Sequence, residues 1–331
     1  MRVFAFAVVA YGLVVACHHD DPAPHAGSAA GSASHDPWQV AAGSAVVVGS
    51  AEFTSWPPSL AERHARAEKL CPTVTPYFFE LTKDGKTSHI LGTRHVGVPF
   101  AKLPKVVHDD LHAAKLAIFE VAPDDKGGFD EPDEPLRDEL GSADWQHFSE
   151  LVGSGTAPLL EHGTTVGATL LIAIELEDTT AILDKEIQDD AGSANIPTGG
   201  LETSDFQDHV LAKLLDLRML KATIETTKDR AELDKDSSKD LREYCLGSND
   251  TPGTDAETRA KLEKAGYSDA EIDTEDDILV FSRNRDWIPK LEKLFAQGDV
   301  FVAVGADHLI GDKGVIKLLE ARGFTAKRIT Q

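Results

Sequence analysis

Two histidines occur in the same local pattern near opposite ends of the chain, and this pattern could place them for chemistry. His95 follows Gly92, and His308 follows Gly305, each glycine standing at the end of a short apolar run. Glycine permits a sharp reversal at a strand end. We therefore expect both imidazoles to point across the carboxyl edge of a sheet, where open α/β sheets bind their ligands.

A glutamate joins these histidines as a candidate for the same site. Glu120 directly follows the apolar run 116–119, which is typical of a buried strand. Two imidazoles and one carboxylate are a common ligand set for a divalent ion with an open position for water. Such an ion supplies hydroxide near neutral pH. His95, His308 and Glu120 therefore predict metal-dependent hydrolysis. The alternative is that each histidine bonds to nearby backbone while Glu120 pairs with an arginine.

The elements that must position these residues follow an α/β pattern. Residues 77–81 and 88–91 predict two strands joined by a turn at 83–86, because Asp followed by Gly is a strong hairpin signal. A helical period over 103–115 then leads into the strand at 116–119.

The C-terminal part repeats the theme, with helical periods at 287–295 and 315–319 and strands at 300–304 and 324–329. We expect a central mixed β-sheet built from two related strand-helix-strand halves.

The middle of the chain, about 140–280, predicts a mainly helical insertion between these halves. Five stretches have helical periods, and two read as loops. The helical stretches are 144–151, 164–176, 181–188, 204–224 and 256–281, and the loops are 127–135 and 247–253.

The same residues carry a family resemblance over about residues 70–331. The runs HILGTRHVGVP, AIFEVAP, IPTGGLETSDFQ and the C-terminal block from SRNRDWIPKLEKLF to AKRI resemble the TraB/GumN family. This resemblance implies a fold related to Tiki metalloproteases, erythromycin esterase-like hydrolases and ChaN-like haem-binding proteins. From Tiki-like members it implies a divalent metal site, holding Mn, Co, Zn or Fe, at His95, His308 and Glu120.

Further site residues follow from the resemblance. Arg283 and Asn284 match the family's Arg-Asn pair, and Glu202 matches its Leu-Glu-Thr acid. Arg283 could steady an anionic intermediate, and Glu202 could orient a histidine or join the ligands. Each could equally form a structural salt bridge. Arg94 departs from the family, which usually has an aliphatic residue there; we expect it to point to solvent, with Asp307 as a compensating charge.

The N-terminus has the features of a secreted lipoprotein. Residues 1–17 form a charged and then apolar signal that ends in LVVAC, which resembles a lipobox and predicts lipidation of Cys17. Residues 18–55 are rich in Gly, Ala, Ser, Pro and His and predict a disordered linker. A TraB/GumN-like domain then occupies 56–331. Cys71 and Cys245 could form a disulfide or remain two buried thiols.

Composition limits the partners. The chain of 331 residues has a formal net charge of -23, which repels phosphate backbones and argues against nucleic acid as a partner.

The leading hypothesis is a metal-dependent hydrolase of the bacterial cell envelope, a peptidase, acting on a peptide or small molecule. The residue after Cys17 is His18 rather than aspartate, which favours the outer membrane, facing the periplasm or the surface, over the inner membrane. The alternative is a non-catalytic lipoprotein that binds haem, a small molecule or a peptide.

Overall fold

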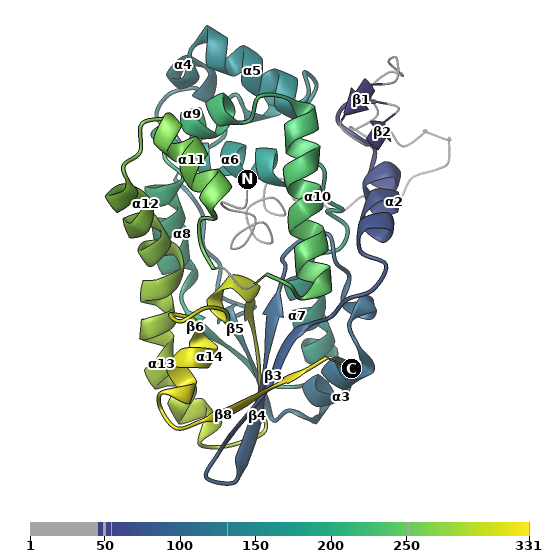
Figure 1. The fold of residues 1–331 in the computed structure, drawn as a ribbon, viewed down its shortest axis with the longest axis vertical. Coiled ribbons are helices and arrows are strands. Elements are labelled where there is room, and N and C mark those ends of the chain that lie inside the picture. The colour runs from purple at the N-terminus through teal and green to yellow at the C-terminus, as the bar shows by residue number, and fades with distance from the viewer. Residues whose placement is uncertain (1–45, 49–50, 54, 131, 250–251, 331) are drawn as a thin grey trace, which may run out of the picture.

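A six-stranded mixed sheet forms the base of the protein (Figure 1). The computed structural model describes residues 46–48, 51–53, 55–130, 132–249 and 252–330. The strand order is β6-β5-β7-β4-β3-β8. Strand β3 runs antiparallel to the other five strands, which all point the same way. The predicted α/β class with a mixed sheet is confirmed. The strands are β3 (Tyr77–Lys83), β4 (Lys86–Thr93), β5 (Leu116–Val121), β6 (Thr198–Glu202), β7 (Val300–Gly305) and β8 (Thr325–Ile329).

The predicted hairpin opens this sheet. Strands β3 and β4 pair antiparallel down to Lys83 opposite Lys86. Asp84 and Gly85 both have positive φ, 49° and 72°. A two-residue turn of this kind matches the twist of the strands, and Asp-Gly accommodates it with little strain.

Strand β7 brings the C-terminal part of the chain into the middle of the N-terminal strands. It runs parallel to β4 on one side and to β5 on the other, with Val304 opposite Gly92 and Ala303 opposite Phe119. Because parallel strands end at the same edge, the residues that follow β4, β5 and β7 meet there. The sheet therefore brings the three sequence-predicted site segments to one edge.

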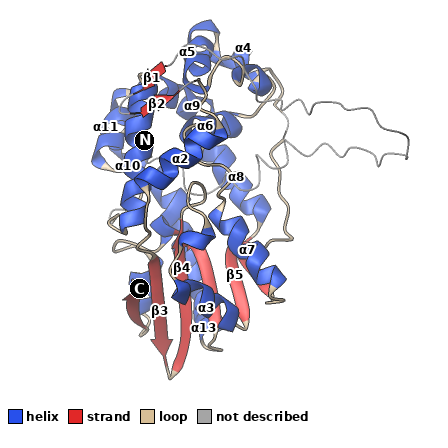
Figure 2. Cartoon of the chain, turned by 90° about the vertical axis from the view of Figure 1, so that its right-hand side faces the viewer, coloured by secondary structure: helices blue, strands red, loops and turns tan. Residues whose placement is uncertain are grey.

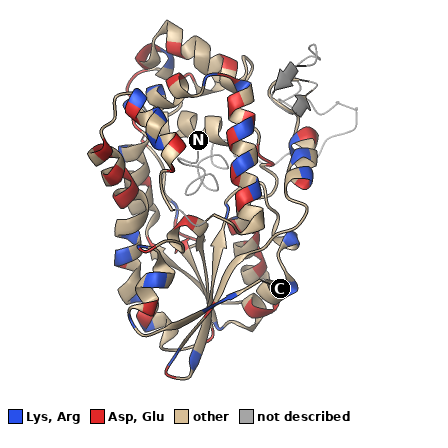
Figure 3. Ribbon diagram, in the orientation of Figure 1, with Lys and Arg blue, Asp and Glu red and all other residues tan. Residues whose placement is uncertain are grey.

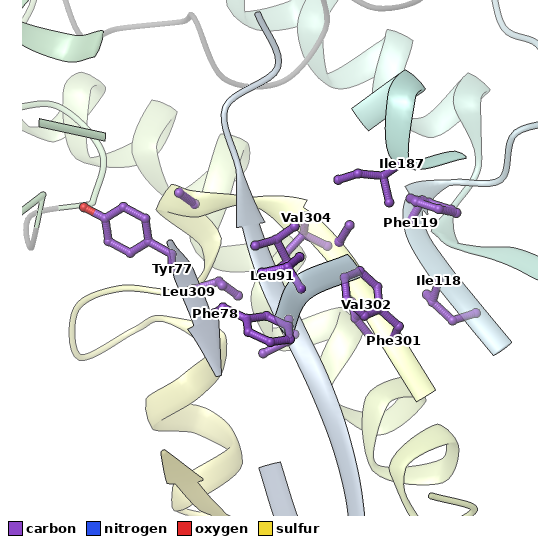
Figure 4. Close-up of a cluster of buried hydrophobic side chains, with 14 of the residues drawn as sticks. Tyr77, Phe78, Leu91, Ile118, Phe119, Ile187, Phe301, Val302, Val304 and Leu309 are labelled. Carbon is purple, nitrogen blue, oxygen red and sulfur yellow. The ribbon is translucent and has the colours of Figure 1, made fainter. Parts of the chain in front are cut away.

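The sheet is held by a continuous apolar core on both of its faces (Figure 4). Phe78, Leu91, Phe119, Phe301 and Val302 are among its members and are all buried. Helices from different parts of the chain pack on this part of the molecule (Figures 1 and 2). They are α3 (Lys105–Ala113), α7 (Leu183–Ser193), α13 (Ser282–Phe295), α14 (Val315–Glu320) and η1 (Phe100–Lys102).

Most of the insertion lies beyond the carboxyl ends of the parallel strands (Figure 1). Its helices form two apolar clusters of their own. They are α4 (Leu136–Leu140), α5 (Ser142–Val152), η2 (Ala157–Leu160), α6 (Thr165–Ile174), α8 (Ser204–Leu214), α9 (Leu217–Thr226), α10 (Arg230–Leu246), α11 (Ala256–Lys264), α12 (Asp269–Asp276) and the π-helical turn η3 (Asp277–Phe281). The predicted helical insertion is thus present, but it also supplies strand β6.

Four details of the insertion differ from the expectation. The predicted helix at 256–281 is divided into α11, α12 and the π-helical turn η3. The predicted helix at 204–224 is two helices, because Asp216 caps the start of α9 by accepting from Met219 N. Helix α10 was not predicted, since its buried face carries polar residues such as Asp234 and Ser237. Apolar periodicity cannot detect such a face. Strand β6 was also missed, because Gly199 and Gly200 have low strand propensity.

The cysteines and the N-terminal segment complete the fold. Cys71 and Cys245 form a disulfide that links helix α2 (Leu60–Leu70) to the end of α10. Strands β1 (Val46–Val48) and β2 (Ala51–Phe53) pair antiparallel inside the range predicted as linker. The predicted signal peptide 1–17, the lipidation site Cys17 and residues 18–45 lie outside the described residues. No helix in the described part of the chain is both long and apolar enough to cross a membrane.

Candidate active site

A buried group of charged side chains lies at the carboxyl edge of the sheet. Glu120 is the second-last residue of β5, His308 follows β7, and Arg283 reaches them from α13. Arg283 Nη2 is 2.7 Å from Glu120 Oε2, and His308 Nε2 is 3.8 Å from Glu120 Oε1. His95 interacts electrostatically with Glu120, Arg283 and His308. The structure therefore brings together the residues predicted from opposite ends of the sequence.

Neither motif glycine has a positive φ, and Gly92 serves close packing rather than chain reversal. A Cβ at Gly92 would lie 2.8 Å from Tyr77 Cβ and 2.9 Å from Ala306 Cα. Gly305 has φ of -51°, which any residue can adopt, and its N–H donates to Glu120 Oε1 at 2.8 Å. The expectation of a sharp reversal is wrong at both positions. At Gly92, the absence of a side chain lets β4 approach the turn that carries His308.

His95 is oriented by an aspartate from the insertion. His95 Nδ1 lies 2.5 Å from Asp184 Oδ2, and Thr93 Oγ1 donates to Asp184 Oδ1 at 2.7 Å. His95 Nε2 is buried and has no hydrogen-bond partner among the described residues. Burial opposes a charge on this ring, but the Asp184 carboxylate outweighs it, so the pKa of His95 is raised. In the neutral ring the carboxylate fixes the tautomer with the proton on Nδ1, so that the Nε2 lone pair is free to accept a proton.

The backbone near Asp184 is tied directly to the first motif. Leu183 N donates to His95 O at 3.1 Å, and Gly97 N donates to Ala181 O at 2.9 Å. Asp184 lies in the first turn of α7, where acidic residues are common in any helix. Sequence reasoning missed Asp184 because this position carries no signal that separates a functional aspartate from an ordinary one.

Arg94 does not point to solvent as expected. Its side chain is buried and forms a bidentate pair with Glu177, at 3.0 Å and 2.9 Å. Its Nη1 also donates to Val96 O. Since Glu177 compensates the charge, Arg94 anchors the loop around His95 to the insertion instead of altering the site.

His308 lies in a very different environment from His95. Asn284 Nδ2 donates to Lys313 O at 3.0 Å, which turns Asn284 Oδ1 toward His308 Nδ1 at 2.7 Å. His308 Nε2 then accepts from Arg283 Nη1 at 3.3 Å. Trp287 packs against the ring, with centroids 4.4 Å apart. Burial and the nearby cation Arg283 lower the pKa of His308 to about 3, despite Glu120. His308 is therefore neutral, and both of its nitrogens are occupied.

Arg283 holds this cluster together with all five of its N–H groups. Nε donates to Glu202 Oε2 at 3.1 Å, and Nη2 donates to Glu202 and Glu120. Nη1 donates to Leu279 O at 2.9 Å and faces His308. Leu279 belongs to the π-helical turn η3, and such turns are frequent at functional sites. No donor of Arg283 is left for an anionic intermediate in this arrangement.

The two carboxylates bound to Arg283 differ in their ionisation. Burial would raise the pKa of Glu120, but Arg283, His308 and His95 lower it to about 2. At Glu202 the cost of burial is larger than the attraction of Arg283, so its pKa is raised. Gln207 Nε2 lies 3.0 Å from Glu120 Oε2 and 3.3 Å from Glu202 Oε1. Glu202 is therefore connected to Glu120 twice, through Arg283 and through Gln207.

Asp307 does not compensate the charge of Arg94 as predicted, because Arg94 pairs with Glu177. Asp307 is buried, and its Oδ1 accepts from Asn249 Nδ2 at 3.1 Å. Asn249 follows α10, and its N–H donates to Tyr77 Oη at 2.6 Å. Asp307 thus connects the second motif to the loop after α10.

The arrangement does not fit a divalent ion at His95, His308 and Glu120. The described ranges contain no group of three or more His, Cys, Asp or Glu side chains that could hold a metal. His308 Nε2 and Glu120 Oε2 both face the Arg283 guanidinium. A cation would have to displace this guanidinium before it could reach those ligand atoms.

Fold and site together define an α/β protein with a buried histidine and carboxylate cluster at the carboxyl edge of a mixed sheet, covered by a helical insertion. The profile of the TraB/PrgY/gumN family matches residues 77–328, and the chain belongs to this family. The sequence-based family prediction is therefore confirmed. No match was found among curated proteins or among solved structures.

Proposed function

We propose that this chain is a hydrolase of acyl bonds, a peptidase in the first instance, in which His95 activates water. The observation that carries the proposal is the His95–Asp184 pair with a buried Nε2 that has no partner in the described part of the chain. A histidine fixed by a carboxylate, with its other nitrogen free, is the arrangement of a general base.

The proposed reaction uses this pair for both proton transfers. His95 Nε2 accepts a proton from water while the water oxygen bonds to the acyl carbon. Asp184 stabilises the resulting imidazolium. The imidazolium then returns the proton to the leaving amine or alkoxide as its bond to the acyl carbon breaks. The products are a carboxylic acid and the free amine or alcohol.

The remaining charged residues position the base and keep the site polar. Arg283 fixes Glu120 and Glu202, and Glu120 is in turn held by Gly305 N. Ionised Glu120 favours the protonated form of His95, which develops during the reaction. His308 completes the frame as a neutral acceptor for Arg283.

Dependence on Mn, Co, Zn or Fe stays a prediction from the sequence. It would require Arg283 to leave its carboxylates, so no step proposed above passes through a metal.

Lipidation at Cys17 and a place in the cell envelope are likewise part of the proposal, supported by the N-terminal sequence. Retention of radiolabelled palmitate by the parent and its loss in Cys17→Ser would support the anchor; label in neither would refute it.

The chemistry is tested with the purified full chain on fluorogenic casein and p-nitrophenyl acetate, each with and without EDTA. We expect turnover that survives EDTA and falls by about 10²–10⁴-fold in His95→Asn. The matched control is His112→Asn, which alters an exposed histidine that also pairs with an aspartate, Asp190.

Two results would refute this reaction. One is full activity in His95→Asn. The other is stoichiometric metal in the purified protein together with complete loss of activity in EDTA, which would favour the metal-dependent hydrolase instead.

A further inference from the structure

Strand β6 is an open edge of the sheet beside the candidate site. It pairs with β5 on one side, and no strand within the described residues pairs with its other side. Ala117 N donates to Pro197 O at 2.9 Å, so the backbone of Pro197 faces β5. In a parallel ladder every second residue faces the same neighbouring strand, so the backbone of Gly199 also faces β5. The N–H and C=O groups of Thr198 and Gly200 therefore point outward. Both residues are exposed.

The opposite edge of the same sheet is protected, whereas β6 is not. Strand β8 carries Lys327 and Arg328, and Lys327 is exposed. Charged side chains on an edge strand discourage pairing with another chain. The outward-facing stretch of β6 from Thr198 to Gly200 carries no charge and no proline. Its backbone is thus available for pairing with an added strand.

The open edge is continuous with the candidate site. The last residue of β6 is Glu202, whose carboxylate is bound by Arg283 and by Trp287 Nε1. Gln207, from the helix that follows β6, bridges Glu202 and Glu120. A strand added to β6 would therefore lie beside the strand that carries Glu202, one member of the charged cluster.

The surface beyond the end of β6 is acidic. Ser204 donates from N and Oγ to Asp125, and Asp208 lies close enough to Asp205 and Asp125 for their charges to help raise its pKa. With a chain net charge of -23, this end of the edge attracts cationic side chains.

We infer that β6 binds an extended, basic peptide segment as an added strand, with the outward backbone groups of Thr198 and Gly200 as its pairing partners. This inference rests on the proposed function, for which it names the substrate class. Main-chain pairing supplies affinity, and the aspartates at the end of the edge favour lysine or arginine in the peptide.

The test measures binding of a fluorescein-labelled decapeptide of alternating valine and lysine to the full chain by fluorescence anisotropy. Thr198→Pro removes an outward N–H that the β5 ladder does not use, whereas Thr198→Val keeps it. We expect Thr198→Pro to weaken binding at least about tenfold and Thr198→Val to change it less than about twofold, with similar melting temperatures. The same peptide with every second amide N-methylated should not bind to the parent protein.

Three results would overturn the inference. The first is equal binding by Thr198→Pro with an unchanged melting temperature. The second is equal binding of the N-methylated peptide, which decides the matter even if Thr198→Pro fails to fold. The third is a concentration-dependent dimer that Thr198→Pro abolishes, which would assign the edge to a second copy of the chain. Because anisotropy needs no turnover, these results are separate from those that test His95.

Discussion

The two Gly-x-x-His segments have the same sequence pattern and the same place at a strand end, yet the protein gives their histidines opposite properties. His95 faces the carboxylate of Asp184 and has a raised pKa, with Nε2 free. His308 faces the amide of Asn284 and the guanidinium of Arg283, and its pKa falls to about 3. The motif positions an imidazole, but the residue opposite each ring determines its chemistry.

The source of the opposing residues explains this difference. Asp184 comes from α7 in the insertion, whereas Asn284 and Arg283 come from α13, next to β7. The first motif therefore depends on the insertion for its function. The second depends on a helix that belongs to the sheet-bearing part of the fold.

The largest expected effect comes from removing the carboxylate that distinguishes His95. Asp184→Asn should lower kcat of the hydrolysis by about 10²–10⁴-fold, because the tautomer is no longer fixed and the imidazolium loses its counter-ion. Asp190→Asn, which alters the exposed His112–Asp190 pair, is the control and should have little effect. Steady-state kinetics on the same substrate decides. Equal rates in the two variants would mean that Asp184 does not give His95 a catalytic property that His308 lacks.

Arg283 should dominate stability at the second motif. Arg283→Met leaves Glu120 and Glu202 buried without a cation, which we expect to cost about 3–5 kcal/mol in free energy of unfolding. Arg285→Met removes a bidentate pair with Asp277 that is about half exposed, and should cost less than about 1 kcal/mol. Urea unfolding compares the two.

Adding Glu120→Gln and Glu202→Gln to Arg283→Met should restore much of the loss, since no buried charge then remains. Similar costs for Arg283→Met and Arg285→Met would show that the buried cluster contributes little.

Much of the fold could be predicted because apolar periodicity and turn residues reflect backbone geometry. The Asp84-Gly85 hairpin and the strands that end at Thr93, Val121 and Gly305 are examples. Helix α10 could not be predicted, since its buried side consists of residues such as Asp234, which is paired with Arg66. Such pairing depends on contacts between distant segments and leaves no local period.

The site was predicted in part for the same reason. His95, His308, Glu120, Arg283, Glu202 and Asn284 all lie in or next to the cluster. The sequence could not indicate that Arg283 would occupy the space between the predicted metal ligands. It also could not identify Asp184, because the pairing with His95 spans 89 residues.

A smaller change should make the second histidine resemble the first. Asn284→Asp places a carboxylate opposite His308 Nδ1, and the pKa of His308 should rise from about 3 by roughly 1–3 pH units. A pH titration of the histidine ¹H–¹⁵N signals measures this shift, and the His95 signal serves as the internal reference. An unchanged His308 titration would mean that Arg283, rather than the amide, sets its properties.

The smallest expected effect concerns the support of the first motif by the insertion. Glu175 lies two residues before Glu177, the partner of Arg94, and its burial outweighs Arg63 and Arg230 to raise its pKa to about 8. The folded state therefore keeps a proton that the unfolded state releases above about pH 4.5. The sign follows: this group lowers the free energy of unfolding as pH rises from about 4.5 to about 8.

Glu175→Gln, which cannot ionise, should remove that part of the slope. The variant should gain stability relative to the parent between pH 5 and pH 8, by at least about 1 kcal/mol. Urea unfolding at several pH values measures the difference, and Asp255→Asn provides the contrast. Burial would raise the pKa of Asp255, but Thr258 and Lys239 lower it to about 2, so Asp255 is ionised across this range and its replacement should shift stability without changing the slope. Parallel curves for Glu175→Gln and the parent would mean that Glu175 is already ionised in its pair with Arg63. In that case the buried ion pair of Arg63 and Glu175 would hold helix α2 against the insertion, as Arg283 holds the second motif.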